Sequence, residues 1–430
     1  MQKCLSLPSR NINSKIKPSN VNYYQMFMHT RALLQSLIQI QNKCLDISMA
    51  RGKPCQEQVD LSMPMLDLLK SDSNLIVNDV DYRNYGILDG IPECKKMFSY
   101  ITGLKEENII IYGNASLFIM ASLLDKSMIH GVNGGIPFSK QEHIKWLCPV
   151  PGYDRHFAIC EALGIEMINV PLNDDGPDMD LAESLIKDST VKGIWCVPKY
   201  SNPTGTTYSD EVVRRFAKLK PAAKDFRIYW DLAYLAQSTF EGGYEPLLNI
   251  YDECVKNNNE DIVYIFTSTS KMTFPGAGVA MLGASPNNLK DIKSTLKYQT
   301  IGYDKLNQLR HALFFKDENT IREHMNKHAK ILKPKFDLVL KIFDEEIKDI
   351  ARYDRPKGGY FISLYTKNAS EVVKICKELG VTLTDVGAAY PYHKDPNNEH
   401  IRICPSYPTL EELEIATKVI CLAVKMAYNK

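Results

Sequence analysis

Short apolar runs alternate with amphipathic stretches through residues 80–320. Apolar runs bounded by turn residues predict strands, and apolar positions spaced three and four apart predict helices. The strands are expected at 144–148, 166–170, 192–197, 226–231, 262–267 and 279–284, and the helices at 116–129, 154–163, 209–219 and 288–299. This alternation predicts an α/β fold with a large, doubly wound, mostly parallel sheet.

The two ends of the chain follow a different pattern. Residues 22–45 have helical apolar spacing, 320–348 read as one long helix, and strands at 359–364 and 400–404 then mix with helices at 369–379 and 409–427. This order predicts a smaller α+β domain formed by both ends. The expected organisation is a tail over 1–20, a segment of the small domain over 21–79, a large domain over 80–319 and the C-terminal small domain over 320–430.

The composition excludes several classes of protein. The chain has 430 residues, 44% of them hydrophobic and 24% charged, with a net charge of +1, as in a large globular enzyme. This near-neutrality gives no electrostatic reason to expect nucleic acid or a membrane surface as the partner. No apolar run approaches the roughly 18 residues of a membrane helix. The eleven cysteines contain no Cys-x-x-Cys pair, which argues against disulfides and structural zinc and favours a cytoplasmic protein without a metal.

The first 45 residues contain neither Asp nor Glu, which is a weak sign of an organelle transit peptide. Arginine is not prominent in this stretch, however, and Pro8 and Pro18 would interrupt a helix. A disordered tail is therefore the preferred interpretation.

Polar motifs follow three of the predicted strands. Asn202, in Asn-Pro-Thr-Gly, follows the strand at 192–197, and Asp231, with Tyr234 three residues on, ends the strand at 226–231. Lys271, in Ser-Thr-Ser-Lys, follows the next strand. Taken alone, such an Asp is often a helix cap and such a Lys a solvated loop residue. Because ligands bind at the carboxyl ends of parallel strands, we expect these side chains to converge on one site.

This set of side chains suits pyridoxal phosphate. A lysine forms a Schiff base with its aldehyde, and an acid such as Asp231 holds its pyridinium nitrogen protonated. Asn202 and Tyr234 can hydrogen-bond its phenolate oxygen. Burial beside a cationic cofactor would lower the pKa of Lys271 from about 10.4, so that its amine can act as a base.

A site for the cofactor phosphate is predicted at residues 113–116. The sequence Gly113-Asn114-Ala115-Ser116 opens a predicted helix, whose N-terminal N–H groups favour an anion. Ser116 can equally be a plain N-cap. Ser268 and Ser270, which flank Lys271, and Tyr85 are the further candidates for the cofactor site.

Together these motifs resemble the fold-type I, class I/II aminotransferases, over roughly residues 45–425. Longer strings resemble an aspartate aminotransferase-like subgroup, namely Arg51-Gly-Lys-Pro54, Pro149 to Phe157, Gly193 to Gly205, Ser268 to Gly278 and Asn307 to His311. The resemblance implies a homodimer with active sites at the interface, in which Tyr85 reaches the neighbouring subunit's cofactor phosphate. It also implies that Arg402 binds the substrate α-carboxylate, with the Gly52 backbone nearby.

The chain departs from this family in two places. Most relatives carry an arginine in Pro-Gly-x-Arg after the lysine to bind the phosphate, whereas this chain has Pro275-Gly-Ala-Gly278. Another cation must therefore meet the phosphate charge. The aromatic residue that stacks on the cofactor ring is also displaced, since Val150 occupies one expected position, and Tyr153 is the candidate instead.

The resemblance implies an aminotransferase that moves an amino group from an L-amino acid, with aspartate expected, to a 2-oxo acid, with 2-oxoglutarate expected, by a ping-pong mechanism. The same apparatus also serves β-lyases and decarboxylases, because bond orientation at Cα selects the reaction. A third hypothesis is a sensing module of a transcription regulator. The 45 residues before the matching region leave little room for its helix-turn-helix domain.

His324 and His328 lie four residues apart on the long predicted helix. This spacing can place two imidazoles on one metal ion, but no Glu follows His324 as it does in zinc proteases. We therefore expect both histidines on a solvated helix face.

Overall fold

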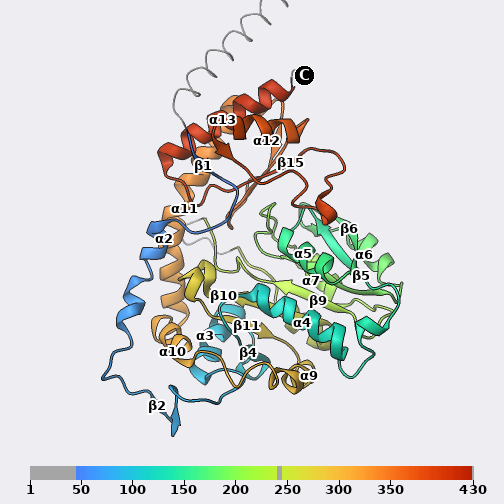
Figure 1. Cartoon of the computed structure of the whole chain (residues 1–430), viewed down its shortest axis with the longest axis vertical. Coiled ribbons are helices and arrows are strands. Elements are labelled where there is room, and N and C mark those ends of the chain that lie inside the picture. Colours follow the sequence, from blue (N-terminus) through green and yellow to red (C-terminus); the bar gives the residue numbers. More distant parts are fainter. Residues whose placement is uncertain (1–44, 240–244, 429–430) are drawn as a thin grey trace, which may run out of the picture. The chain divides into compact units, whose positions relative to one another are not determined.

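The computed structural model describes residues 45–239 and 245–428 (Figure 1). The tail expected over 1–20 and nearly all of the helix expected over 22–45 lie outside the described residues. The domain boundaries expected at 79–80 and 319–320 stay predictions.

A mixed sheet of eight strands forms the larger part of the described chain. Its strand order is β4 (Ile109–Ile111), β11 (Ala280–Gly283), β10 (Val263–Ser268), β9 (Arg227–Asp231), β8 (Val191–Cys196), β5 (Lys145–Val150), β6 (Glu166–Asn173) and β7 (Gly176–Pro177). The central strands from β10 to β6 are parallel. Only β11 runs antiparallel to both its neighbours, and β7 runs antiparallel to β6. The predicted mostly parallel sheet is confirmed, with a strand at each of the six expected positions.

Helices cover both faces of this sheet, because successive strand residues point to opposite sides. In β9, Ile228 and Trp230 enter one hydrophobic cluster and Tyr229 enters another. The first cluster is completed by α3 (Pro92–Thr102), α6 (Met179–Leu185), α7 (Asp210–Ala217), α8 (Ile250–Lys256) and α10 (Lys305–Phe314). The second is completed by α4 (Ser116–His130), α5 (Asp154–Ala162) and α9 (Pro286–Leu296). This double covering is the doubly wound arrangement that the sequence predicts.

A second, antiparallel sheet has the order β12 (Arg352–Tyr353), β13 (Ile362–Tyr365) and β15 (His400–Ile403). It is accompanied by α11 (Glu318–Glu346), α12 (Ala369–Glu378) and α13 (Leu410–Tyr428). No helix among the described residues is both long and apolar enough to cross a bilayer.

The N-terminal end of the described chain joins this smaller sheet region. Strand β1 (Ile47–Ser48) pairs in parallel with β14 (Val381–Thr382), and the Met49 carbonyl accepts a hydrogen bond from the Cys404 N–H. The short elements α2 (Gln56–Asp60), β2 (Ile76–Val77) and β3 (Val80–Asp81) follow. Because Cys404 lies just after β15, this pairing carries residues 50–54 to the strand that holds Arg402.

Candidate active site

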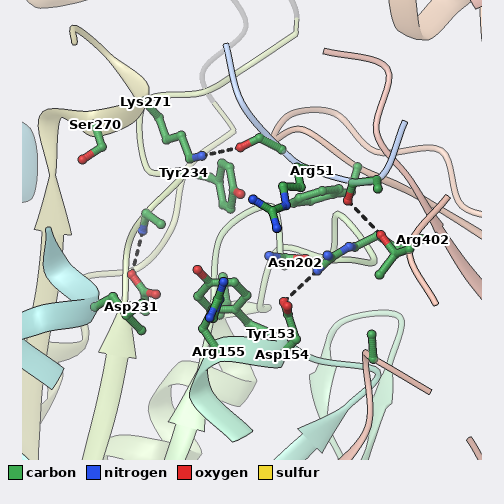
Figure 2. A pocket seen from close by; sticks show the side chains of 18 of the residues that line it. Arg51, Tyr153, Asp154, Arg155, Asn202, Asp231, Tyr234, Ser270, Lys271 and Arg402 are labelled. Carbon is green, nitrogen blue, oxygen red and sulfur yellow. Dashed lines mark hydrogen bonds and ion pairs between the residues drawn. The ribbon is translucent and has the colours of Figure 1, made fainter. Parts of the chain in front are cut away.

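A cavity of 720 Å³ lies where the parallel strands of the large sheet end (Figure 2). Its lining includes Asn202 from the loop after β8, Asp231 from the end of β9 and Lys271 from the turn after β10. Arg402 of β15 lines the same cavity. Small-molecule sites have volumes of about 300–1,000 Å³, so the cavity has room for a cofactor and a small substrate. The three motifs therefore converge as the sequence predicts.

Lys271 ends a 3₁₀ turn, Thr269–Lys271, and its amine points into the cavity (Figure 2). The amine donates a hydrogen bond to the Gly52 carbonyl at 2.7 Å. It lies 4.9 Å from the centre of the Tyr360 ring and 5.9 Å from that of Tyr234. Burial lowers the pKa of Lys271 to about 8, against the smaller opposing effects of Cys404 and Asp231. The amine is therefore a stronger candidate base at neutral pH than an exposed lysine.

Asp231 is buried and held from two sides. One carboxylate oxygen accepts the Ala233 N–H at 3.1 Å, and the other lies 3.2 Å from His156 Nε2. The His156 ring stacks on Trp195 with ring centres 4.4 Å apart. His156 thus orients the acid. A carboxylate fixed in this way suits a protonated pyridine nitrogen.

The guanidinium of Arg402 is anchored along one edge. Its Nη1 donates to Asp154 Oδ1 at 2.9 Å and to Asn202 Oδ1 at 3.3 Å. Its Nε is buried and has no hydrogen-bond partner among the described residues. This leaves a guanidinium edge that can take a carboxylate by two parallel bonds.

The first turn of α4 lines the cavity. Ala115 is its N-cap, and no side chain caps this helix N-terminus. Ser116 is therefore the first helical residue and not an N-cap. Ala115, Ser116, Ser268 and Ser270 all line the cavity. Backbone N–H groups that lack a cap, together with hydroxyls, suit a phosphate group.

Two predicted cofactor residues lie outside the cavity lining. The backbone carbonyl of Asn114 accepts a hydrogen bond from the Ser270 hydroxyl at 3.0 Å, and the Asn114 side-chain amide donates to the Gly276 carbonyl. Tyr85 is 82% exposed. Its contact with a neighbouring subunit stays a prediction. Tyr153, the candidate for stacking on the cofactor ring, does line the cavity and meets the His156 ring edge-on.

The loop that lacks the family arginine packs against the lysine turn. A Cβ on Gly278 would lie 3.2 Å from the Thr269 hydroxyl and 3.3 Å from that of Ser270. Asn307 holds this loop by donating to the carbonyls of Ala277 and Gly278, each at 3.0 Å. The close approach gives a physical reason for glycine at this position.

Sequence reasoning missed two cations that line the cavity, Arg51 and Arg155. Both are exposed, and neither guanidinium forms a hydrogen bond or ion pair with another described residue. Figure 2 shows both directed toward the space that Lys271 and Arg402 also face. Each lies in one of the sequence strings that resemble the aspartate aminotransferase-like subgroup, and this position could have marked both residues as candidates for the site.

The expectation for His324 and His328 is wrong. Both are buried, with 6% and 1% of their surface exposed, and both face the Met272 carbonyl. Among the described residues, no group of three or more His, Cys, Asp and Glu side chains could hold a metal ion.

The chain matches known proteins along most of its length, including the residues of this site. A family model described as aspartate amino-transferase matches residues 26–430. An aspartate aminotransferase of Corynebacterium glutamicum is 41% identical over 394 residues, which cover 90% of this chain and 91% of that protein. A Mycolicibacterium smegmatis protein named as an aminotransferase is 43% identical over 386 residues, 88% of this chain and 90% of that one. The crystal structure of an aspartate transaminase from Corynebacterium glutamicum has a TM-score of 0.91 at 39% identity, covering 94% of this chain and 96% of that chain.

Proposed function

We propose that this chain, which belongs to the aspartate aminotransferase family, transfers the amino group of L-aspartate to 2-oxoglutarate in a ping-pong reaction. As a member of that family, it is a pyridoxal phosphate-dependent aminotransferase of fold type I. The observation that carries this proposal is the meeting of Lys271, Asp231 and the free edge of Arg402 in one cavity. When bound, pyridoxal phosphate supplies an aldehyde that accepts the amino group and a ring that accepts the electron pair of Cα.

The residues present fit this cofactor. The uncapped start of α4, with Ser116, Ser268 and Ser270, would hold the phosphate. Asp231, oriented by His156, would hold the ring nitrogen, and Asn202 and Tyr234 the ring oxygen. Tyr153 would lie against the ring face. We further propose a homodimer in which the partner subunit's Tyr85 completes the phosphate site.

Lys271 would act as the catalytic base. Its lowered pKa keeps a useful fraction of the amine neutral near pH 7, so that Nζ can take the proton from Cα of the substrate and later return one. The lining of Tyr234 and Phe361 rings would limit water around this proton transfer. Arg402 would bind the α-carboxylate through the edge that Asp154 and Asn202 leave free.

Two exposed cations in the same cavity favour a dicarboxylic substrate. L-aspartate and 2-oxoglutarate each carry a second carboxylate beyond the one that Arg402 would bind. Arg51 and Arg155 have no competing ion pair within the described residues, so either guanidinium can meet that second charge.

The test is to add L-aspartate, without an acceptor, to the purified holoenzyme. We expect the visible band of the cofactor to be lost with release of about one oxaloacetate per site, and to return when 2-oxoglutarate is added and glutamate forms. Lys271→Ala serves as the inactive control. Release of ammonia or carbon dioxide without oxaloacetate would replace the proposal with a lyase or a decarboxylase. An unchanged band would exclude aspartate as the donor.

A further inference from the structure

A buried pair of histidines closes the back of the lysine turn. His324 and His328 lie one helical turn apart on α11, the 29-residue helix of the smaller sheet region. Their Nε2 atoms lie 2.7 Å and 3.0 Å from the carbonyl oxygen of Met272, the residue that follows Lys271. Both helix and turn are buried here, so the pair is an internal contact and not a surface feature.

The hydrogen bonds around His328 define which of its ring nitrogens carries the proton. Gln58 Oε1 accepts the Cys55 N–H at 3.2 Å, which orients the Gln58 amide. Its Nε2 then lies 3.1 Å from His328 Nδ1 and donates to it, so Nδ1 carries no proton and Nε2 does. Burial lowers the pKa of His328 to about 3 and also lowers the pKa of His324. Two neutral imidazoles thus face one carbonyl oxygen, which has two lone pairs for them, and their Nε2 atoms lie 3.1 Å from each other.

The same network reaches the lysine amine from its other side. Gln58 Nε2 also contacts the Tyr360 hydroxyl at 3.2 Å. The ring of Tyr360 lies under the Lys271 amine, 4.9 Å from Nζ to the ring centre. One set of hydrogen bonds therefore holds both the backbone just past Lys271 and an aromatic ring against its amine. The set links α2, α11 and Tyr360, which lies two residues before β13, to the turn after β10.

We propose that His328, with His324, is a positioning residue for Lys271. The pair holds the Met272 carbonyl and so aims the turn that carries the lysine, while Gln58 ties the pair to the ring beneath the amine. This inference rests on the proposed role of Lys271 as the cofactor-linked base. Neither histidine touches the reacting atoms, and a metal or a proton relay plays no part in it.

The test compares His328→Leu with His328→Gln in the holoenzyme. Leucine fills the space without polar atoms, whereas glutamine keeps an N–H donor and a carbonyl acceptor. We expect His328→Leu to lower kcat about 10- to 100-fold, with a smaller change in KM, because displacing a reacting group by about 1 Å can cost two orders of magnitude. The visible circular dichroism of the bound cofactor should change as well. His328→Gln should stay within about threefold of the native kcat, because it keeps the positioning bonds.

Val339→Ala, a core truncation further along α11, is the structural control. It should lower the melting temperature and leave the circular dichroism and kcat unchanged. If His328→Leu does not fold, Gln58→Met removes the donor to Nδ1 and should change the same spectrum. Native kcat and circular dichroism in His328→Leu, or in Gln58→Met where that variant is needed, would overturn the inference. If Lys271→Ala keeps both the cofactor band and activity, the proposed role of Lys271 fails, and this inference fails with it.

Discussion

Replacing Arg402 by lysine should weaken all amino-acid substrates to a similar extent. In the structure, one guanidinium nitrogen of Arg402 serves Asp154 at 2.9 Å and Asn202 at 3.3 Å, and the buried Nε has no partner among the described residues. A guanidinium can hold Asp154 with one edge and a substrate carboxylate with another. A lysine ammonium keeps the charge but has no second edge, so it loses one of the two bonds to the substrate.

The size of the effect follows from that lost bond. A hydrogen bond to a charged group contributes about 1.5–3 kcal/mol. At about 1.4 kcal/mol per factor of ten, kcat/KM should fall roughly 10- to 150-fold. Because the α-carboxylate is common to all amino acids, the factor should be similar for L-aspartate, L-glutamate and L-alanine.

The assay is steady-state kcat/KM for these three donors, with cofactor content checked by absorbance. Arg355→Lys is the matched control, since Arg355 pairs with Asp344 on the surface and lies outside the cavity lining. A fall of less than about threefold for every donor would refute the assignment of Arg402 to the α-carboxylate. A loss confined to aspartate and glutamate would instead place the distal carboxylate on Arg402.

Arg51→Met and Arg155→Met, unlike Arg402→Lys, should discriminate between donors. Replacing the arginine that binds the distal carboxylate should lower kcat/KM about tenfold or more for L-aspartate and little for L-alanine. Equal losses for both donors would contradict this role. In the cofactor-free protein, Lys271→Met should raise the free energy of unfolding by roughly 3 kcal/mol below pH 8. Burial lowers the pKa of Lys271 from 10.5 to about 8, so the charged amine is the form that destabilises the folded protein. The stability gained by removing this amine should therefore vanish as the pH rises toward 10.5. Denaturant titrations at both ends of this pH range measure the difference. Gly193→Ala should lower the free energy of unfolding by about 2 kcal/mol or more. Its Cβ would lie 2.3 Å from Trp146 in the core, whereas Gly276→Ala, with open space around its Cβ, should be nearly neutral in the same titration.

The hydrophobic pattern determined the elements of both sheet regions. Strands buried on both faces, such as β9 and β10, read as continuous apolar runs, and amphipathic helices such as α7 and α11 show their own period of burial. Strand β4 was not predicted, because a run of three isoleucines is too short to distinguish a strand from a loop. Asn202, Asp231 and Lys271 were predictable as neighbours, because residues at the carboxyl ends of parallel strands meet at one sheet edge.

Tertiary structure decided what surrounds these residues. Pairing of β1 with β14 brings Arg51 to the cavity, and a hydrogen bond joins Arg402 of β15 to Asp154 at the start of α5, although 248 positions separate the two residues. The helical spacing of His324 and His328 was visible in the sequence, yet a polar pair at that spacing suits a solvated face as well as a buried one. The carbonyl of Met272 makes the buried position favourable, because it meets the Nε2 atom of each imidazole. A sequence pattern reports how each element is buried, whereas partners far apart along the chain are set by how the elements pack.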